Sequence, residues 1–161
     1  MKAITFLKPN LVDIEMISDT KSKIVIQPLE RGFGHTLGNA LRRVLLSSMP
    51  GSAVTEVSID NILHEYSTID GVQEDVLEII LNIKKLALVL HEKDKIEVVL
   101  RKKGKGPVLA SDIEEHPNLE IKNPAFSLAN ITNDKTELVI NLTISQGKGY
   151  QPATKRKFNE L

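Results

Sequence analysis

A glycine-rich stretch between two patterned segments is the first feature of this sequence that could support chemistry. Residues 32–38 read GFGHTLG, close to the Gly-x-Gly-x-x-Gly pattern that binds dinucleotides at the start of a helix. The last glycine comes one residue late, however. The flanking strand patterns alternate between apolar and polar residues, whereas a buried parallel sheet needs nearly continuous apolar runs. We therefore interpret the glycines as shaping a tight turn from a strand into a helix.

No other group of residues has the spacing of a catalytic or metal site. The four histidines form no His-Glu-x-x-His pair and no three-ligand cluster; they are His35, His64, His91 and His116. Ser47 and Ser48 lack the context of a nucleophile elbow. Cysteine is absent, which excludes disulfides and thiolate metal sites and fits a reducing, cytoplasmic environment. We expect no catalytic residue, cofactor or metal in this chain.

A basic stretch near the C-terminus could contact nucleic acid. Residues 148–157 contain three lysines, one arginine and Tyr150, whose ring could stack on a base. A small direct nucleic-acid-binding protein that uses this loop is therefore one functional hypothesis. Two considerations count against it: basic residues in a terminal loop are mostly solvated, and 21 basic and 21 acidic residues give zero net charge. A protein that grips phosphates is usually basic.

A helix predicted from Thr36 to Met49 presents adjacent arginines beside an apolar stripe. The stripe repeats at i, i+4, i+7 and i+8, and comprises Leu37, Leu41, Val44 and Leu45. Thr36 is the expected N-cap, and Pro50 should end the helix. Arg42 and Arg43 lie roughly 100° apart around the helix and flank the stripe. Arginine at the edge of an apolar surface suits a protein interface, although two solvated arginines on an ordinary amphipathic helix fit the same pattern.

The other elements follow from alternation and turn residues. Residues 11–29 read as a hairpin, and Val57 and Ile59 mark a half-buried strand. A second helix is expected to begin near Gly71. Residues 86–90 and 96–102 read as another hairpin, with short strands around positions 108 and 119. Residues 138–145 alternate most cleanly. The expected fold class is α+β, with mainly antiparallel sheets and two principal helices.

Three long stretches resemble the N-terminal domain of the bacterial RNA polymerase alpha subunit. They are LERGFGHTLGNALRR with the following LLSSMPG, then HEYSTIDGVQEDVLEIILN, and finally GKGYQPA. The similarity is collinear and runs from Phe6 to Ala153. Stretches of this length are far more specific than a short spaced motif.

The resemblance implies two interleaved subdomains. Residues 1–51 would form the first part of a dimerisation subdomain, and residues 52–161 an inserted second subdomain, mostly β with one helix. In the family the chain later returns to the first subdomain and then continues into a DNA-binding domain. This sequence stops at Leu161, before that return, so we expect that it is part of a longer protein.

The resemblance also implies function. It predicts a non-catalytic assembly scaffold in DNA-directed RNA polymerase, a nucleotidyltransferase complex that carries out transcription in the cytoplasm. The predicted partners are a second alpha subunit, identical or related, and the β and β′ subunits, with no membrane and no base-specific DNA contact. The implied dimer interface comprises Phe33, Leu37, Leu41, Val44 and Leu45.

Two further surfaces follow from the same resemblance. The implied β-binding residues are Arg42, Arg43, Leu46, His64, Glu65, Gly71, Glu74 and Asp75. The implied large-subunit contact loop comprises Gly147, Lys148, Gly149, Tyr150 and Pro152. An acidic cluster that follows this loop in some family members is replaced here by KFNEL, so we expect no activator contact of that kind.

Overall fold

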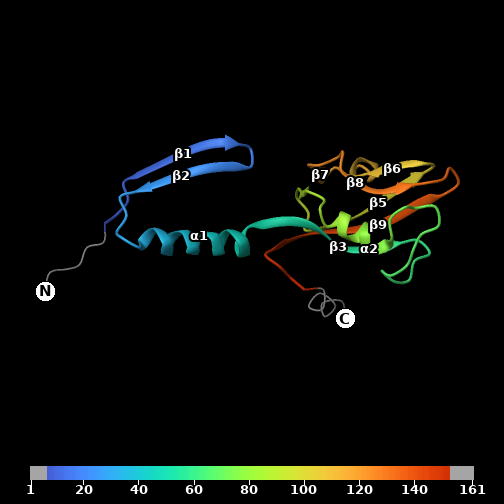
Figure 1. The fold of residues 1–161 in the computed structure, drawn as a ribbon, viewed down its shortest axis with the longest axis horizontal. Helices are drawn as coiled ribbons and strands as arrows, with labels where there is room; N and C mark the ends of the chain where they lie inside the picture. Colours follow the sequence, from blue (N-terminus) through green and yellow to red (C-terminus); the bar gives the residue numbers. More distant parts are fainter. Residues whose placement is uncertain (1–6, 153–161) are drawn as a thin grey trace. The chain divides into compact units, whose positions relative to one another are not determined.

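The chain forms two compact units, Met1–Met49 and Pro50–Leu161. The structure, a computed structural model, describes residues 7–152, and Figure 1 shows the elements of both units. The first unit contains a hairpin and one helix. The second contains the remaining strands and a shorter helix. Helices and antiparallel sheets together confirm the predicted α+β class.

The first unit begins with the predicted hairpin. Strands β1 (Leu11–Ser18) and β2 (Lys21–Gln27) pair antiparallel, in a register that sets Leu11 opposite Gln27. A turn then leads into helix α1 (Phe33–Ser48). The expectation of a hairpin over residues 11–29 is therefore confirmed.

Helix α1 begins earlier than the sequence pattern predicted. Gly32, not Thr36, is the N-cap, and Thr36 lies inside the helix. Gly32 has a φ of +88°, a left-handed conformation that favours glycine. The N–H of Phe33 donates to the carbonyl of Glu30 at 3.0 Å. The turn is thus made by backbone geometry, and no side chain is needed to cap the helix.

The end of α1 is set by Pro50. Met49 is extended, with φ −72° and ψ 130°, because the ring of a following proline disfavours the helical conformation. Strand β3 (Pro50–Ile59) follows directly. It is longer than the predicted strand around Val57 and Ile59.

A five-stranded antiparallel sheet organises the second unit. Its strand order is β5-β9-β3-β4-β7. The strands are β4 (Leu88–Leu90), β5 (Lys95–Lys103), β7 (Leu119–Ile121) and β9 (Glu137–Lys148), together with β3. A separate pair consists of β6 (Gly106–Leu109) and β8 (Ser127–Ile131). The short 3-10 helix η1 (Ala110–Asp112) follows β6. Strand β8 was not predicted.

The predicted hairpin of residues 86–90 and 96–102 is wrong. Strand β4 pairs with β3 and β7, whereas β5 pairs with β9. The ladder between β5 and β9 runs from Lys95 opposite Ser145 to Lys103 opposite Glu137. Strand β4 is three residues long and could offer β5 only a short partner. The longer ladder overrides proximity in the sequence.

Helix α2 (Val76–Ile83) begins later than predicted. Asp75 is its N-cap, and its side chain accepts a hydrogen bond from the N–H of Glu78 at 2.7 Å. Gly71 instead lies in a turn, with a φ of +82°, and Val72 forms an isolated bridge with Ile131. A short polar cap therefore fixes the start of the helix, as carboxylates commonly do.

The core of the molecule, within residues 7–152, lies entirely in the second unit. Strand β9 is at its centre, and its side chains Leu138, Ile140, Leu142 and Ile144 are at most 1% exposed. The predicted alternation in this strand is confirmed. Val76, Ile79 and Ile83 of α2 join the same core. By contrast, none of residues 7–49 is buried.

Replacing Ile140 by alanine should test the central position of β9. Ile140 is fully buried, so Ile140→Ala should lower the free energy of unfolding of the second unit by about 2–5 kcal/mol. Asn141→Ala is the matched control, because Asn141 is exposed on the same strand and its loss should cost under about 0.5 kcal/mol. Urea unfolding followed by circular dichroism measures both. Equal effects of the two substitutions would contradict the assignment.

Candidate protein interfaces

The apolar stripe of α1 lies at the surface of the first unit. Phe33, Leu41, Val44 and Leu45 are 44–57% exposed, and Leu37 is half-buried. Leu46, predicted for a different surface, is 70% exposed. The five residues predicted as a dimer interface are therefore on one helix and accessible. A stripe this apolar is normally covered in a folded protein.

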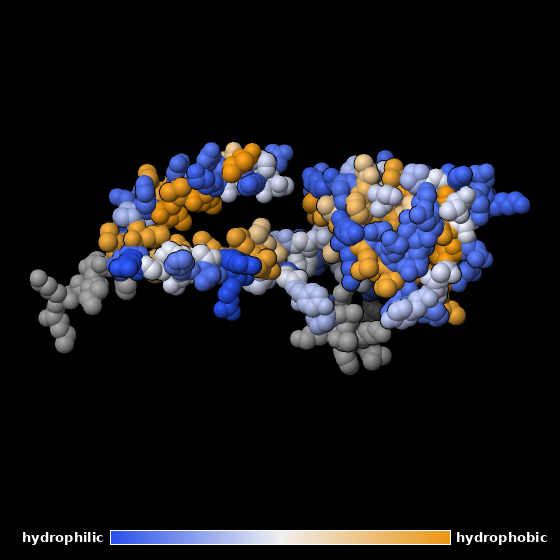
Figure 2. Space-filling model, viewed as in Figure 1, coloured by the Kyte–Doolittle hydropathy of each residue, from blue (hydrophilic) through white to orange (hydrophobic). Residues whose placement is uncertain are grey.

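The hairpin of the same unit exposes a second set of apolar side chains, which sequence reasoning missed. They are Leu11, Val12, Ile14, Met16, Ile17, Ile24 and Val25, all at least 37% exposed. Figure 2 shows apolar surface on both the hairpin and α1. The alternation of apolar and polar residues in β1 and β2 predicted the two strands. It gave no indication that the apolar side chains of the hairpin would remain exposed.

The adjacent arginines of α1 are both exposed. Arg42 and Arg43 have no ion pair within the described part of the chain. The hydroxyl of Ser47 donates to the carbonyl of Arg43 at 2.7 Å, which engages the backbone of Arg43 and leaves its guanidinium available. Both side chains can therefore form the forked hydrogen bonds that arginine makes to a carboxylate.

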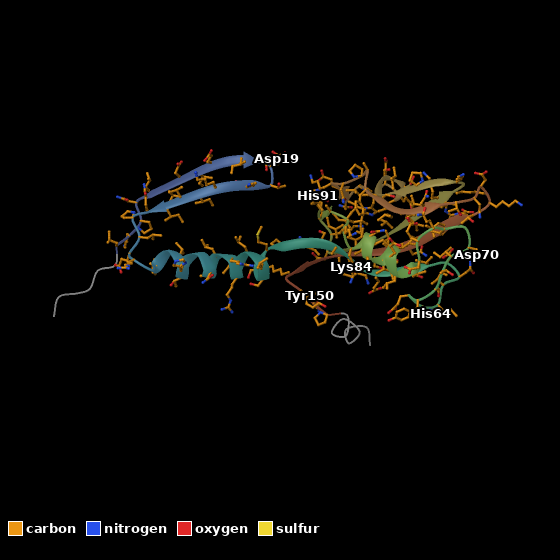
Figure 3. The ribbon with its side chains drawn as sticks, viewed as in Figure 1. Asp19, His64, Asp70, Lys84, His91 and Tyr150 are labelled. Carbon is orange, nitrogen blue, oxygen red and sulfur yellow. The ribbon has the colours of Figure 1, made fainter. Side chains whose placement is uncertain are left out.

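The loop before α2 exposes two large side chains that were not singled out from the sequence. Leu63 is 97% exposed and Tyr66 is 78% exposed. His64, between them, shares a hydrogen bond of 3.1 Å between its Nδ1 and the hydroxyl of Ser67. Figure 3 shows His64 and Asp70 on the loop that leads to α2. Tyrosine is enriched at protein interfaces, so the exposed tyrosine in this loop fits a protein contact.

The end of this loop is held against the turn between β8 and β9. The hydroxyl of Thr136 donates to the carbonyl of Asp70 at 3.1 Å, and the N–H of Thr132 donates to the carbonyl of Gly71 at 2.8 Å. The carboxylate of Glu74 accepts from the N–H of Asn130 at 2.7 Å. Glu74 and the N-cap Asp75 thus have structural partners, while Glu65 is exposed.

Glycine is required at position 71 both because there is no room for a side chain and because the backbone conformation is left-handed. Its φ is +82°, and a Cβ built on it would lie 2.1 Å from the Thr136 hydroxyl and 2.3 Å from the side-chain nitrogen of Asn133. Any side chain there would displace the β8–β9 turn. Gly71 therefore sets the path of the loop. Its predicted contribution to a β-binding surface would be indirect, through the position of that loop.

The predicted contact loop at residues 147–152 begins within β9. Gly147 and Lys148 are the last residues of the strand's exposed end, and Gly149 turns the chain with a φ of +60°. Tyr150 is 92% exposed, and Pro152 is half-buried. Figure 3 shows Tyr150 on the segment that follows β9. The rest of the basic stretch, residues 153–157, lies outside the described residues.

The insert family of RNA polymerase subunits matches most of the second unit. Residues 57–161 match the family model described as the RNA polymerase Rpb3/RpoA insert domain. The chain belongs to the RNA polymerase Rpb3/RpoA insert domain family. This supports the resemblance to the alpha N-terminal domain, which was carried by motifs on both sides of residue 57. The match covers the loop from Leu63 to Asp70, helix α2 and the strand β9.

Membership in this insert domain family makes the chain an RNA polymerase subunit with a role in transcription. The family domain is generally non-catalytic. Among the described residues there is no group of three or more His, Cys, Asp or Glu side chains that could hold a metal ion. No helix in residues 7–152 is long and apolar enough to cross a membrane.

One charged group of the insert domain has a shifted pKa. The hydrogen bond from the ammonium of Lys122 lowers the pKa of the Glu120 carboxyl below its ordinary value of 4.5, and His91 contributes in the same direction. Glu120 therefore carries a negative charge at neutral pH. It lies on β7, an edge strand of the five-stranded sheet.

Substitution of Gly71 should separate the effect of crowding from that of backbone strain. Gly71→Ala should lower the free energy of unfolding by more than about 2 kcal/mol, because a strained φ and two clashes combine. Gly104→Ala is the control: Gly104 has a similar φ of +88° with nothing within 4 Å, so only the cost of strain, about 1–2 kcal/mol, is expected. Urea unfolding measures both, and the crowding argument fails if Gly71→Ala is no more damaging.

Proposed function

We propose that this chain is an assembly scaffold of bacterial RNA polymerase, which dimerises through α1 and recruits the β and β′ subunits. One observation carries the proposal: no residue of the first unit is buried within residues 7–49, although that unit is rich in large apolar side chains. The family match supports the polymerase context. A subunit with an uncovered apolar surface is suited to association.

The energetics favour a partner on α1. Full burial of a leucine, valine or phenylalanine side chain stabilises by about 1.5–3 kcal/mol. Phe33, Leu41, Val44 and Leu45 are each about half exposed, so their burial offers several such increments. A second copy of the same helix would meet the stripe symmetrically, and two-fold pairing closes the assembly at two subunits. A related alpha chain would satisfy the same geometry.

We assign recruitment of the β subunit to polar and exposed groups on each of the two units. The guanidinium of Arg43 has no ion pair within residues 7–152, and Leu46 is more exposed than any residue of the stripe. On the second unit, the loop with His64 and Glu65 adds Leu63 and Tyr66 to the predicted surface. Its fixed path, held at Gly71, gives a partner a defined shape to bind. Residues 147–152 are proposed as the contact with the large subunits.

Charge introduced into the apolar stripe should disrupt the dimer. Leu41→Asp places an unpaired carboxylate in the proposed interface, and burial of a charge there is strongly unfavourable. Asn39→Asp is the control, because its position is about 200° away around the helix and the substitution adds the same charge. Sedimentation equilibrium of the full chain should show a monomer for Leu41→Asp and a dimer for the control. A dimer in both variants would exclude α1 as the interface.

Truncation of Arg43 should weaken binding of the β subunit and leave the dimer intact. Loss of an arginine that anchors an interface costs about 2 kcal/mol or more, which corresponds to about 30-fold in affinity. Lys21→Ala, at the first residue of β2, removes one positive charge elsewhere on the same unit and should change neither property. Calorimetric titration with purified β subunit measures the affinity. Unchanged affinity of Arg43→Ala would refute the role assigned to this residue.

A further inference from the structure

An open groove of about 650 Å³ lies on the second unit, between β7 and the residues that follow η1. One wall is the edge strand β7 with Leu119, Glu120 and Ile121. The other wall is the segment of residues 111–117. This segment is held to the outer edge of β5, because the N–H of Glu114 donates to the carbonyl of Val99 at 2.9 Å. Both walls are therefore anchored to the five-stranded sheet.

The lining of the groove combines an apolar floor with an acidic rim. Ile113 is 3% exposed and joins the core, while Leu119 and Ile121 are half-buried. Three carboxylates line the groove, with no lysine or arginine among its lining residues. Glu114 and Glu115 are exposed and have no ion pair among residues 7–152. Within residues 7–152, neither carboxylate is therefore neutralised by a direct ion pair.

The backbone of β7 offers unused hydrogen-bonding groups along this groove. The strand pairs with β4 on one side only and with no other described strand. The N–H of Lys122 donates to the carbonyl of Ala87. The backbone N–H and C=O groups of every second residue of β7, counted from Lys122, therefore point toward β4. The backbone N–H and C=O groups of Leu119 and Ile121 point the other way, to the outer edge of the sheet. The N–H of Leu119 donates to the carbonyl of His116 in a turn. Within residues 7–152, the groups that remain available to a partner strand are the carbonyl of Leu119 and the N–H and carbonyl of Ile121.

We propose that this groove binds an extended segment of a partner protein in which lysine or arginine side chains alternate with large aliphatic ones. The segment would lie along β7 as an added strand, a common mode of peptide recognition in which backbone hydrogen bonds supply affinity. Successive side chains of a strand point to opposite faces. The aliphatic residues would therefore contact Leu119 and Ile121, and the basic residues the rim carboxylates.

Charge complementarity decides the chemistry of the occupant. Glu120 already has Lys122 and His91 as partners, so the net attraction comes from Glu114 and Glu115. An acidic segment would be repelled by both carboxylates, and like charges across an interface suppress wrong partners. A neutral segment would lose the steering that the rim provides. The groove thus selects for positive charge as well as for an apolar side chain.

Fluorescence anisotropy with defined peptides tests the proposal on the full 161-residue chain. The probe is a labelled nine-residue peptide that alternates lysine with leucine. The wild-type chain should bind it. Glu114→Lys with Glu115→Lys should weaken binding by about tenfold, because two attractive pairs become repulsive. Circular dichroism establishes that the variant remains folded.

A charge-matched variant and two altered peptides complete the test. Glu56→Lys with Asp60→Lys makes the same change in net charge at two exposed positions outside the groove and should alter affinity by less than about twofold. A peptide with glutamate in place of lysine should bind at least about tenfold more weakly, as should one N-methylated at alternate residues, which cannot pair with an edge strand.

Three results would overturn the proposal. They are absence of binding by the wild-type chain, equal binding by the groove variant and the control variant, and full binding of the N-methylated peptide. The groove shares no residue with α1, the loop of residues 63–75 or residues 147–152. The groove proposal can therefore fail while dimerisation and β binding hold, and the reverse is equally distinguishable.

Discussion

The pairing of β9 with both β3 and β5 is the interaction on which the second unit depends. Strand β9 contributes four fully buried aliphatic side chains to the core, and its two ladders join segments far apart in the sequence. Helix α2 and strand β8 pack on the same core. Without β9, the edge strands β5 and β7, which carry the two walls of the groove, would not belong to a common sheet.

The two units differ in whether their large apolar side chains are buried within the chain. The second unit buries its aliphatic side chains within one chain, whereas the first unit leaves those of the hairpin and α1 exposed throughout residues 7–49. A large exposed apolar surface is typical of proteins that associate. In the proposed scaffold, another polypeptide would cover the apolar side chains of the first unit, so that this unit would be complete only in the assembly.

Much of the fold could be predicted from local pattern, and the failures have physical causes. The alternation of Leu138 to Ile144 predicted the central strand, since one face must be buried and the other not. The start of α1 was misplaced because Gly32 makes the turn through its backbone, which leaves no capping side chain to recognise. The pairing of β4 was missed because strand partners depend on the whole sheet. Of the candidate sites, exposure of α1 and Arg43 followed from helical periodicity. Leu63 and Tyr66 lie in a loop without periodicity and needed the structure.

The distance in sequence between β3 and β9 has a consequence for biosynthesis. Ile59 pairs with Ile140, and Pro50 with Lys148, so the sheet cannot close until the ribosome has released residues near the end of β9. Until then β3 lacks its long partner, and the hairpin and α1 emerge even earlier with apolar side chains uncovered. Pairing of such distant segments is slow, and unpaired strands are prone to aggregate in the interval. The nascent chain should therefore engage chaperones while it is synthesised, and rare codons placed between β3 and β9 should prolong that engagement.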